Sequence, residues 1–169
     1  EAAWVVLSAG MRETVIRGLF DLVSAAFLCW ESACRILREK ETCRAVALTC
    51  FRNQRKIDAI IGIAEIVDSE GFKHLKARIS EHGAQVLQEL PYIGPITSYH
   101  LAKNVGLNVA KPDRHLQRVA AATGFETPAA LCTELAEAVG DRKAVVDIVI
   151  WRFATIYSEY LSFFSGEAP

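Results

Sequence analysis

Apolar residues recur at intervals of three or four positions along almost the whole chain, which is the spacing of amphipathic α-helices. One clear example is the series Ile57, Ile60, Ile61, Ala64 and Val67, which places its apolar side chains on one helical face. No run of alternating apolar and polar residues is long enough to require a β-strand. The pattern therefore predicts an all-α fold.

Glycine residues divide the first half of this pattern into separate helices. The opening helix should stop near Gly10, and a second helix is expected over about residues 13–27. Gly71 and Gly83 enclose a short helix that is rich in Lys and His.

Capping residues and breakers divide the second half in the same way. Asp113 stands where the N-cap of a helix over 114–122 would stand. Thr127 and Pro128 begin another helix, which Gly140 and Asp141 break. Residues 143–164 are expected to form one long, largely buried helix.

A tight turn is predicted between a helix that ends at Leu90 and a helix that starts at Pro95 and reaches about Asn104. Gly94 is expected to allow a backbone geometry that a side chain would forbid. The free N–H groups of the new helix would point outward at the turn, where they can bind a phosphate oxygen. A plain αα-hairpin is the commoner meaning of such a turn and is the alternative.

Asp113 is the one carboxylate between Glu89 and Glu126, so any carboxylate beside the turn in sequence must be this one. An aspartate before a helix is most often a cap. A fixed carboxylate can also stabilise the positive charge that builds on a sugar when its bond to a base breaks, and it can orient the attacking water. The two roles are compatible.

Together these segments resemble the helix-hairpin-helix DNA glycosylase superfamily (HhH-GPD), which includes endonuclease III and the adenine glycosylase MutY. Leu90 to Ser98 resembles its hairpin, and Lys111 to Arg118 resembles the segment that holds its catalytic aspartate. These two carry the specific part of the resemblance. Weaker likenesses are Val5 to Ala9 with the "LLSAQ" helix end, Lys56-Ile57 with a Lys-Ala before a helix, and Asp147 to Trp151 with a late helix.

The resemblance implies two helical lobes with a cleft between them. Residues 1–105 would form the first lobe, including the helix-hairpin-helix over 84–104, and residues 106–169 the second, which carries the catalytic Asp113 at its start. The implied function is a DNA glycosylase that hydrolyses the N-glycosidic bond of a flipped, damaged or modified base. Its partner would be double-stranded DNA, bound by a monomer.

The chain departs from the superfamily inside the hairpin. Members that also nick the strand carry a lysine two residues after the last hairpin glycine, whereas this chain has Ile96, which cannot form a Schiff base. The resemblance therefore implies a monofunctional glycosylase. Lys111 is the one lysine near Asp113 in sequence, and we expect it to contact phosphate or to be solvated.

A second departure concerns the residues that handle the flipped base. Gly10 replaces the glutamine that often fills the gap in the duplex, so Met11 or Arg12 is the candidate wedge. Trp30 beside Glu31 is a candidate base pocket, because a ring can stack on the base and a carboxylate can read its edge.

Basic residues gather in two stretches. The first, left undecided between DNA and a solvated face, holds Arg35, Arg38, Lys40, Arg44, Arg52, Arg55 and Lys56. The second, favoured for DNA, holds His100, Lys103, Lys111, Arg114, His115 and Arg118. The residues expected to bind DNA are Tyr92, Ile93, Gly94, Ile96, Thr97, Lys111, Arg114 and Arg118.

No metal or cofactor is expected. Only Cys132 follows Asp113, so the four-cysteine iron–sulfur loop of several relatives cannot form. The irregular spacing of Cys29, Cys34, Cys43, Cys50 and Cys132 indicates reduced core thiols.

Composition limits the remaining choices. A net charge of −1 leaves room for a local basic face. No stretch reaches the roughly 18–20 apolar residues that span a bilayer. With no signal peptide visible, we expect an intracellular protein, in the cytoplasm or nucleoid if prokaryotic. The chain opens at Glu1 inside an apolar helical pattern, which leaves open a longer protein.

Two rival functions stay open at this stage. One is a non-catalytic DNA-binding module that uses the same hairpin, and the other is a structural or protein-interaction role, which predicts no salt-sensitive DNA binding. The identity of the excised base is also open.

Overall fold

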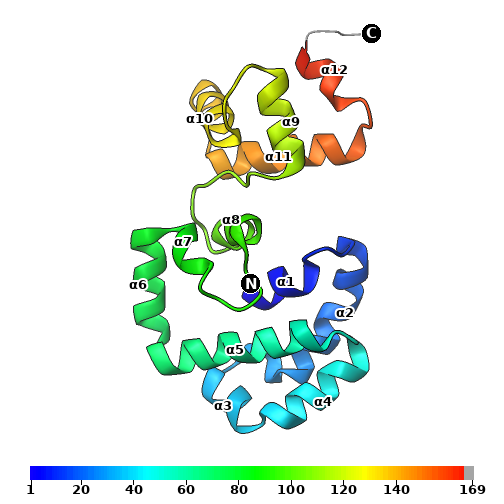
Figure 1. Ribbon diagram of the computed structural model, residues 1–169, viewed down its shortest axis with the longest axis vertical. Helices are drawn as coiled ribbons and strands as arrows, with labels where there is room; N and C mark the ends of the chain where they lie inside the picture. Colours follow the sequence, from blue (N-terminus) through cyan, green and yellow to red (C-terminus); the bar gives the residue numbers. More distant parts are fainter. Residues whose placement is uncertain (166–169) are drawn as a thin grey trace. The chain divides into compact units, whose positions relative to one another are not determined.

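The computed structural model describes residues 1–165, which form helices and connecting segments without a strand (Figure 1). The all-α prediction is confirmed. The helices are α1 (Ala2–Ser8), α2 (Glu13–Ala26), η1 (Leu28–Trp30), α3 (Ala33–Arg38), α4 (Lys40–Cys50), α5 (Gln54–Glu70), α6 (Phe72–His82), α7 (Ala84–Leu87), α8 (Pro95–Asn104), α9 (Arg114–Ala122), α10 (Pro128–Val139), α11 (Lys143–Ile156) and α12 (Tyr160–Ser165).

Contacts divide the chain into two compact units, Glu1–Leu101 and Ala102–Pro169. The division falls inside α8, whereas the sequence placed it after residue 105. The last three residues of α8, including Lys103, therefore belong to the second unit.

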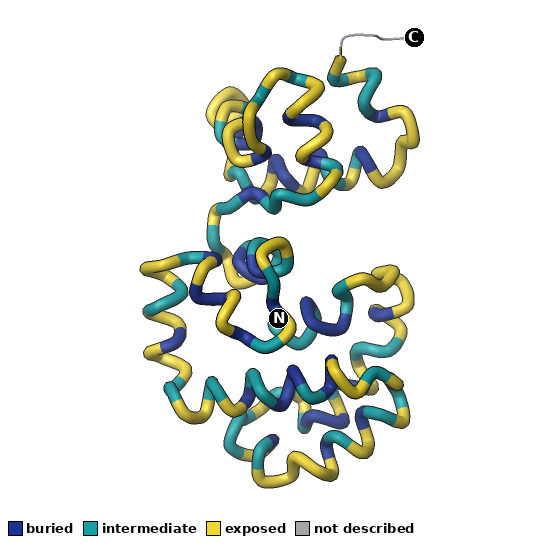
Figure 2. The backbone as a smooth tube through the Cα atoms, in the orientation of Figure 1, coloured by how far each residue is buried: buried dark blue, intermediate teal, exposed yellow. Residues whose placement is uncertain are grey.

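In the first unit, α5 is the helix around which the others pack. It contacts α1, α3, α4 and α6 (Figure 1). Ile57, Ile60 and Ile61 on its apolar face are buried, and Val67 near its end is half-buried. The buried stretches of α1 and α5 stand out in Figure 2. The face predicted from the sequence is the face that packs.

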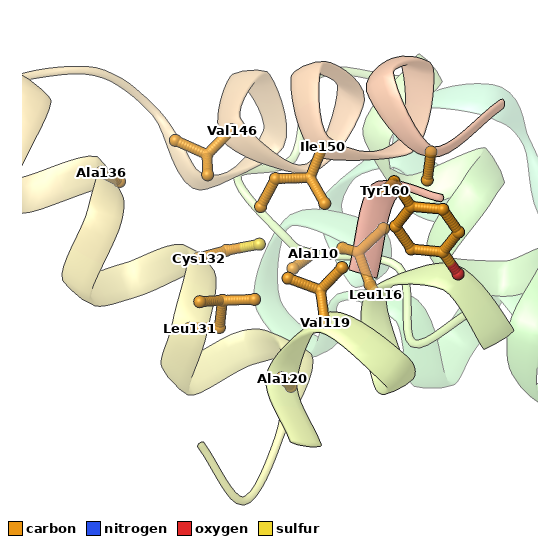
Figure 3. Close-up of a cluster of buried hydrophobic side chains, with 11 residues drawn as sticks. Ala110, Leu116, Val119, Ala120, Leu131, Cys132, Ala136, Val146, Ile150 and Tyr160 are labelled. Carbon is orange, nitrogen blue, oxygen red and sulfur yellow. The ribbon is translucent and has the colours of Figure 1, made fainter. Parts of the chain in front are cut away.

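The second unit has a core of its own, built from α9, α10 and α11 (Figure 3). Leu116 and Val119 from α9 meet Leu131 from α10 and Ile150 from α11. Tyr160, which is 4% exposed, lies beside Leu116 and closes this core.

The long helix predicted over 143–164 is wrong. The helix α11 ends at Ile156, Tyr157 is extended, and α12 starts at Tyr160. The break returns the chain to α9, where Tyr160 is buried and its hydroxyl lies 3.2 Å from Nδ1 of His115. An unbroken apolar period cannot reveal such a reversal, because both arrangements have the same local pattern.

Other predicted ends agree with the structure. The range of α8 is as expected, and α10 has Thr127 as its N-cap and Gly140 in the left-handed region at its end. Gly71 and Gly83 bound α6. The helix expected to end at Leu90 stops earlier, at Leu87, because Leu90 belongs to the turn that follows.

The cysteines are free, and they differ in burial. Cys43 and Cys132 are buried as expected, and burial raises the pKa of the Cys132 thiol to about 11. Cys29 is exposed, so the expectation of core thiols is wrong for this residue. Within the described part of the chain, no helix is long and apolar enough to cross a bilayer.

Candidate active site and hairpin

Asp113 is the N-cap of α9, as the sequence predicts. Its Oδ1 accepts hydrogen bonds from the main-chain N–H groups of His115 (3.0 Å) and Leu116 (3.1 Å). The side chain is 12% exposed, and Oδ2 lies 4.0 Å from Nζ of Lys111. The cap therefore fixes the direction of the carboxylate and leaves Oδ2 without a close partner from the cap.

Asp147 on α11 supports this segment from inside the unit. Its side chain is 1% exposed and accepts hydrogen bonds from the Lys103 ammonium and from the main-chain N–H of Lys111. A buried carboxylate with these two partners holds the chain that precedes Asp113. Sequence reasoning gave Asp147 no role, although a single acid on an apolar helical face was a visible signal.

Lys111 is largely buried, with 22% of its side chain exposed. Burial lowers the pKa of its ammonium group, and the nearby Lys103 lowers it further, while Asp113 and Asp147 oppose the shift. The expectation of a solvated side chain is therefore wrong. A phosphate contact by Lys111 stays a prediction.

Two cations of the second basic stretch face solvent. Arg114 and Arg118 lie one turn apart on α9 and are exposed. Lys103 is different, because it is 10% exposed and paired with Asp147. A DNA contact is therefore not expected from Lys103. It is still expected from Arg114, Arg118 and the exposed part of the Lys111 side chain.

The hairpin is built on a tight turn in the first unit. Ile93 N–H donates to the carbonyl oxygen of Leu90 over 3.1 Å. Pro91 occupies the second position of this turn, and Tyr92 occupies the third with a φ of 67°. Proline followed by a residue with positive φ is typical of a type II turn, in which glycine normally takes Tyr92's position.

Gly94 does not play the expected steric role. Its φ is outside the left-handed region, and a Cβ there would meet only the Thr97 hydroxyl, at 3.9 Å. The residue that needs the unusual backbone is Tyr92. Gly94 instead donates its N–H to Oγ1 of Thr97 over 2.7 Å, which caps the start of α8.

The first turn of α8 has open main-chain donors. Ser98 donates to the carbonyl oxygen of Gly94, and Pro95 has no N–H. The N–H groups of Ile96 and Thr97 have no acceptor among the described residues. The side chain of Ile93 is 5% exposed, so this predicted DNA contact is limited to its backbone. The turn can thus offer amides to an anion.

Lys56 connects the hairpin with the end of α1. Its Nζ donates to the carbonyl oxygens of Leu7 (2.6 Å) and Ala9 (2.7 Å) and lies 5.7 Å from the ring centre of Tyr92. The side chain is 2% exposed, and burial lowers the pKa of its ammonium group. Because Lys56 is buried, it cannot contribute to an exposed basic face.

The candidate wedge follows directly on the segment that Lys56 holds. Met11 is 39% exposed and donates its N–H to the carbonyl oxygen of Ser8 over 3.0 Å. Arg12 is exposed at the start of α2. In the first unit, Lys56 therefore contacts both the chain that leads into the wedge candidates and the ring of Tyr92 in the hairpin.

The candidate base pocket is less favourable. Trp30 stacks on Phe27, with ring centres 5.2 Å apart, and its φ of 62° follows two other left-handed residues. Glu31 pairs with Arg35, so its carboxylate is already engaged. Arg35 and other members of the first basic stretch are paired in the same way, with Arg44 bound to Glu41 and Asp58.

Comparison with protein-family models, curated proteins and solved structures finds no match for this chain.

Proposed function

We propose that this protein is a DNA glycosylase that hydrolyses the N-glycosidic bond of a damaged or modified base flipped out of double-stranded DNA. The observation that carries the proposal is the arrangement at Asp113. A mostly buried carboxylate is fixed by two main-chain amides, and its second oxygen lies 4.0 Å from the Lys111 amine.

Such a carboxylate suits the reaction because the departing base leaves positive charge on the sugar ring. A negative group held in place stabilises that charge without reorganising. It can also accept a proton from the attacking water. Glycoside hydrolases use carboxylates for the same two tasks.

The hairpin supplies the second part of the proposal. The open amides of Ile96 and Thr97 would hold a backbone phosphate, with the Tyr92 ring exposed beside them. Arg114 and Arg118 would add charge contacts from the second unit. These contacts position DNA without reading its sequence.

The enzyme is a monofunctional glycosylase in this proposal. Because Ile96 gives the hairpin no amine, water must displace the base. No cofactor takes part. The enzyme acts as a monomer and, in a prokaryotic cell, would work at the nucleoid.

Asp113→Asn tests the catalytic role. Asparagine is as good an N-cap as aspartate, so the variant should fold and bind DNA normally. We expect base release to fall by about 10²–10⁴-fold, the usual contribution of a general acid or base. The assay uses duplexes that each carry one altered base, with alkali to cleave the abasic sites formed. Equal rates for the variant and the parent protein would refute the role of Asp113.

The competing proposal is a non-catalytic DNA-binding module. The complete N-cap at Asp113 favours it, because a cap alone explains why an aspartate stands there. In that case the chain would bind DNA in a salt-sensitive way and release no base from any duplex of the panel.

A further inference from the structure

We propose that Tyr92, in the turn of the hairpin, stacks its ring on an unpaired nucleobase of the bound DNA. This contact lies beyond the phosphate contact of the hairpin amides, and it rests on the proposed function for the presence of DNA at the hairpin. The ligand class is a base without a pairing partner. Its identity is open, because every base presents a flat face to an aromatic ring.

The backbone of Tyr92 is the first argument. Its φ of 67° is a value that glycine adopts without cost and that other residues rarely adopt. The turn therefore gives no reason for a large side chain at this position. The hydrophobic core gives none either, because Tyr92 is 45% exposed, whereas the next residue, Ile93, is 5% exposed. Backbone strain kept at such a position is typical of a functional contact.

The support of the ring is the second argument. The Lys56 ammonium lies over the ring, 5.7 Å from its centre, and is itself held by two main-chain carbonyl oxygens at the end of α1. Pro91 packs against Gly62, where an added Cβ would lie 3.1 Å from Cγ of the proline. Both supports come from α5, so the turn is fixed on one helix. A ring held in this way loses little conformational freedom when it meets a ligand.

The exposed surface of the ring is the third argument. None of the ring pairs formed within residues 1–165 includes Tyr92. By contrast, Trp30 already stacks on Phe20 and Phe27, with ring centres 6.1 and 5.2 Å away. Tyr92 is therefore an aromatic residue of the first unit whose ring can accept a flat partner from outside.

The neighbouring main chain indicates that this partner belongs to a nucleotide. The open amides of Ile96 and Thr97 follow the turn and can hold a phosphate. Proteins that bind unpaired strands combine contacts to the backbone with aromatic rings that stack on the bases. In an intact duplex the neighbouring bases cover both faces of each base. The ring therefore selects a place where pairing has been lost.

The test compares two duplexes of the same sequence, one fully paired and one in which a single adenine lies opposite a tetrahydrofuran abasic analogue. Fluorescence anisotropy gives the Kd of each at one salt concentration. We expect the parent protein to bind the second duplex more tightly by about fivefold or more, as a base–aromatic stacking contact provides. Tyr92→Phe should keep this preference because the ring remains, and Tyr92→Leu should lose it.

The ratio of the two Kd values is the decisive measurement, because a folding defect or a lost phosphate contact weakens both complexes alike. Tyr157→Leu is the control, since it removes a tyrosine that is 52% exposed after the end of α11 and should leave both Kd values unchanged. Equal affinity of the parent protein for the two duplexes would overturn the inference. So would a preference that survives in Tyr92→Leu or disappears in Tyr92→Phe.

The assay measures binding alone, so its result does not depend on base release. A preference for the unpaired duplex, together with no base release from any altered base, would reject the glycosylase and keep the stacking contact. Base release without that preference would reject the stacking contact and keep the glycosylase.

Discussion

Within the hairpin, Tyr92 is the residue whose backbone φ is least usual for its residue type. A left-handed φ costs an L-amino acid about 1–2 kcal/mol, and glycine avoids this cost. In compensation, the ring lies 5.7 Å from the Lys56 ammonium, which also holds the end of α1. Strain of this kind is kept where surrounding contacts enforce it, often at functional sites.

A pair of substitutions separates the backbone cost from the ring contacts at this position. Tyr92→Ala loses the ring and keeps the strain, whereas Tyr92→Gly loses the ring and relieves it. We expect the glycine variant to be more stable than the alanine variant by about 1 kcal/mol in urea unfolding. An alanine variant as stable as the glycine variant would show that the turn relaxes.

Asp113 is a single residue that can serve both as a helix cap and as the proposed catalytic carboxylate. A cap needs one carboxylate oxygen, and the structure commits Oδ1 to it. The other oxygen keeps the charge available for a ligand. The cap therefore does not compete with catalysis and gives the carboxylate a fixed direction.

At the scale of elements, the start of α8 is the feature that bears on DNA. An amide group at a helix start binds an anion when nothing covers it. Neither the φ of Gly94 nor its neighbours require glycine at this position. Its effect at the start of α8 is therefore the absence of a side chain. A Cβ at this position would have only the Thr97 hydroxyl within 4 Å, so the space beside Gly94 is open to a ligand.

Gly94→Ala tests this interpretation. Its Cβ would lie in ordinary contact with Thr97, so the unfolding free energy should stay the same or rise by about 0.5–1 kcal/mol. DNA binding should weaken by about tenfold, or about 1.4 kcal/mol, because the methyl group would crowd the phosphate. Fluorescence anisotropy with labelled duplex measures the affinity. Unchanged binding would place the phosphate elsewhere.

Elements also interact through buried charges in the second unit. Asp147 joins α11 to Lys103 on α8 and to the connector that leads to Asp113. An ion pair this deeply buried is strongly destabilising to break from one side. Asp147 on α11 therefore holds the connector at Lys111, two residues before Asp113.

At the scale of the whole molecule, the charge is nearly balanced, with a net charge of −1. Binding to a polyanion must then come from local features. Many basic side chains are paired with acids, including Arg17 with Glu13 and Arg78 with Glu70. Arg114 and Arg118 are exposed cations close to Asp113 in sequence.

Replacing Arg114 and Arg118 by Gln should weaken DNA binding and make it less dependent on salt. Each lost phosphate contact lowers the slope of log K against log salt concentration by about 0.9. Arg17→Gln is the control, since it removes one positive charge from an arginine that already pairs with Glu13 and should leave the slope unchanged. A slope unchanged by the double substitution would exclude these arginines from the interface.

The sequence by itself determined the helical class, the ends of α6, α8 and α10 and the N-cap at Asp113, because periodicity and capping depend on residues within a few positions of one another. The tertiary structure decided the contacts of Lys56 with Leu7 and of Asp147 with Lys111, which join residues 49 and 36 positions apart. It also decided the break before Tyr160 and the burial of Lys111. These features depend on which helices meet, and no local pattern records that choice.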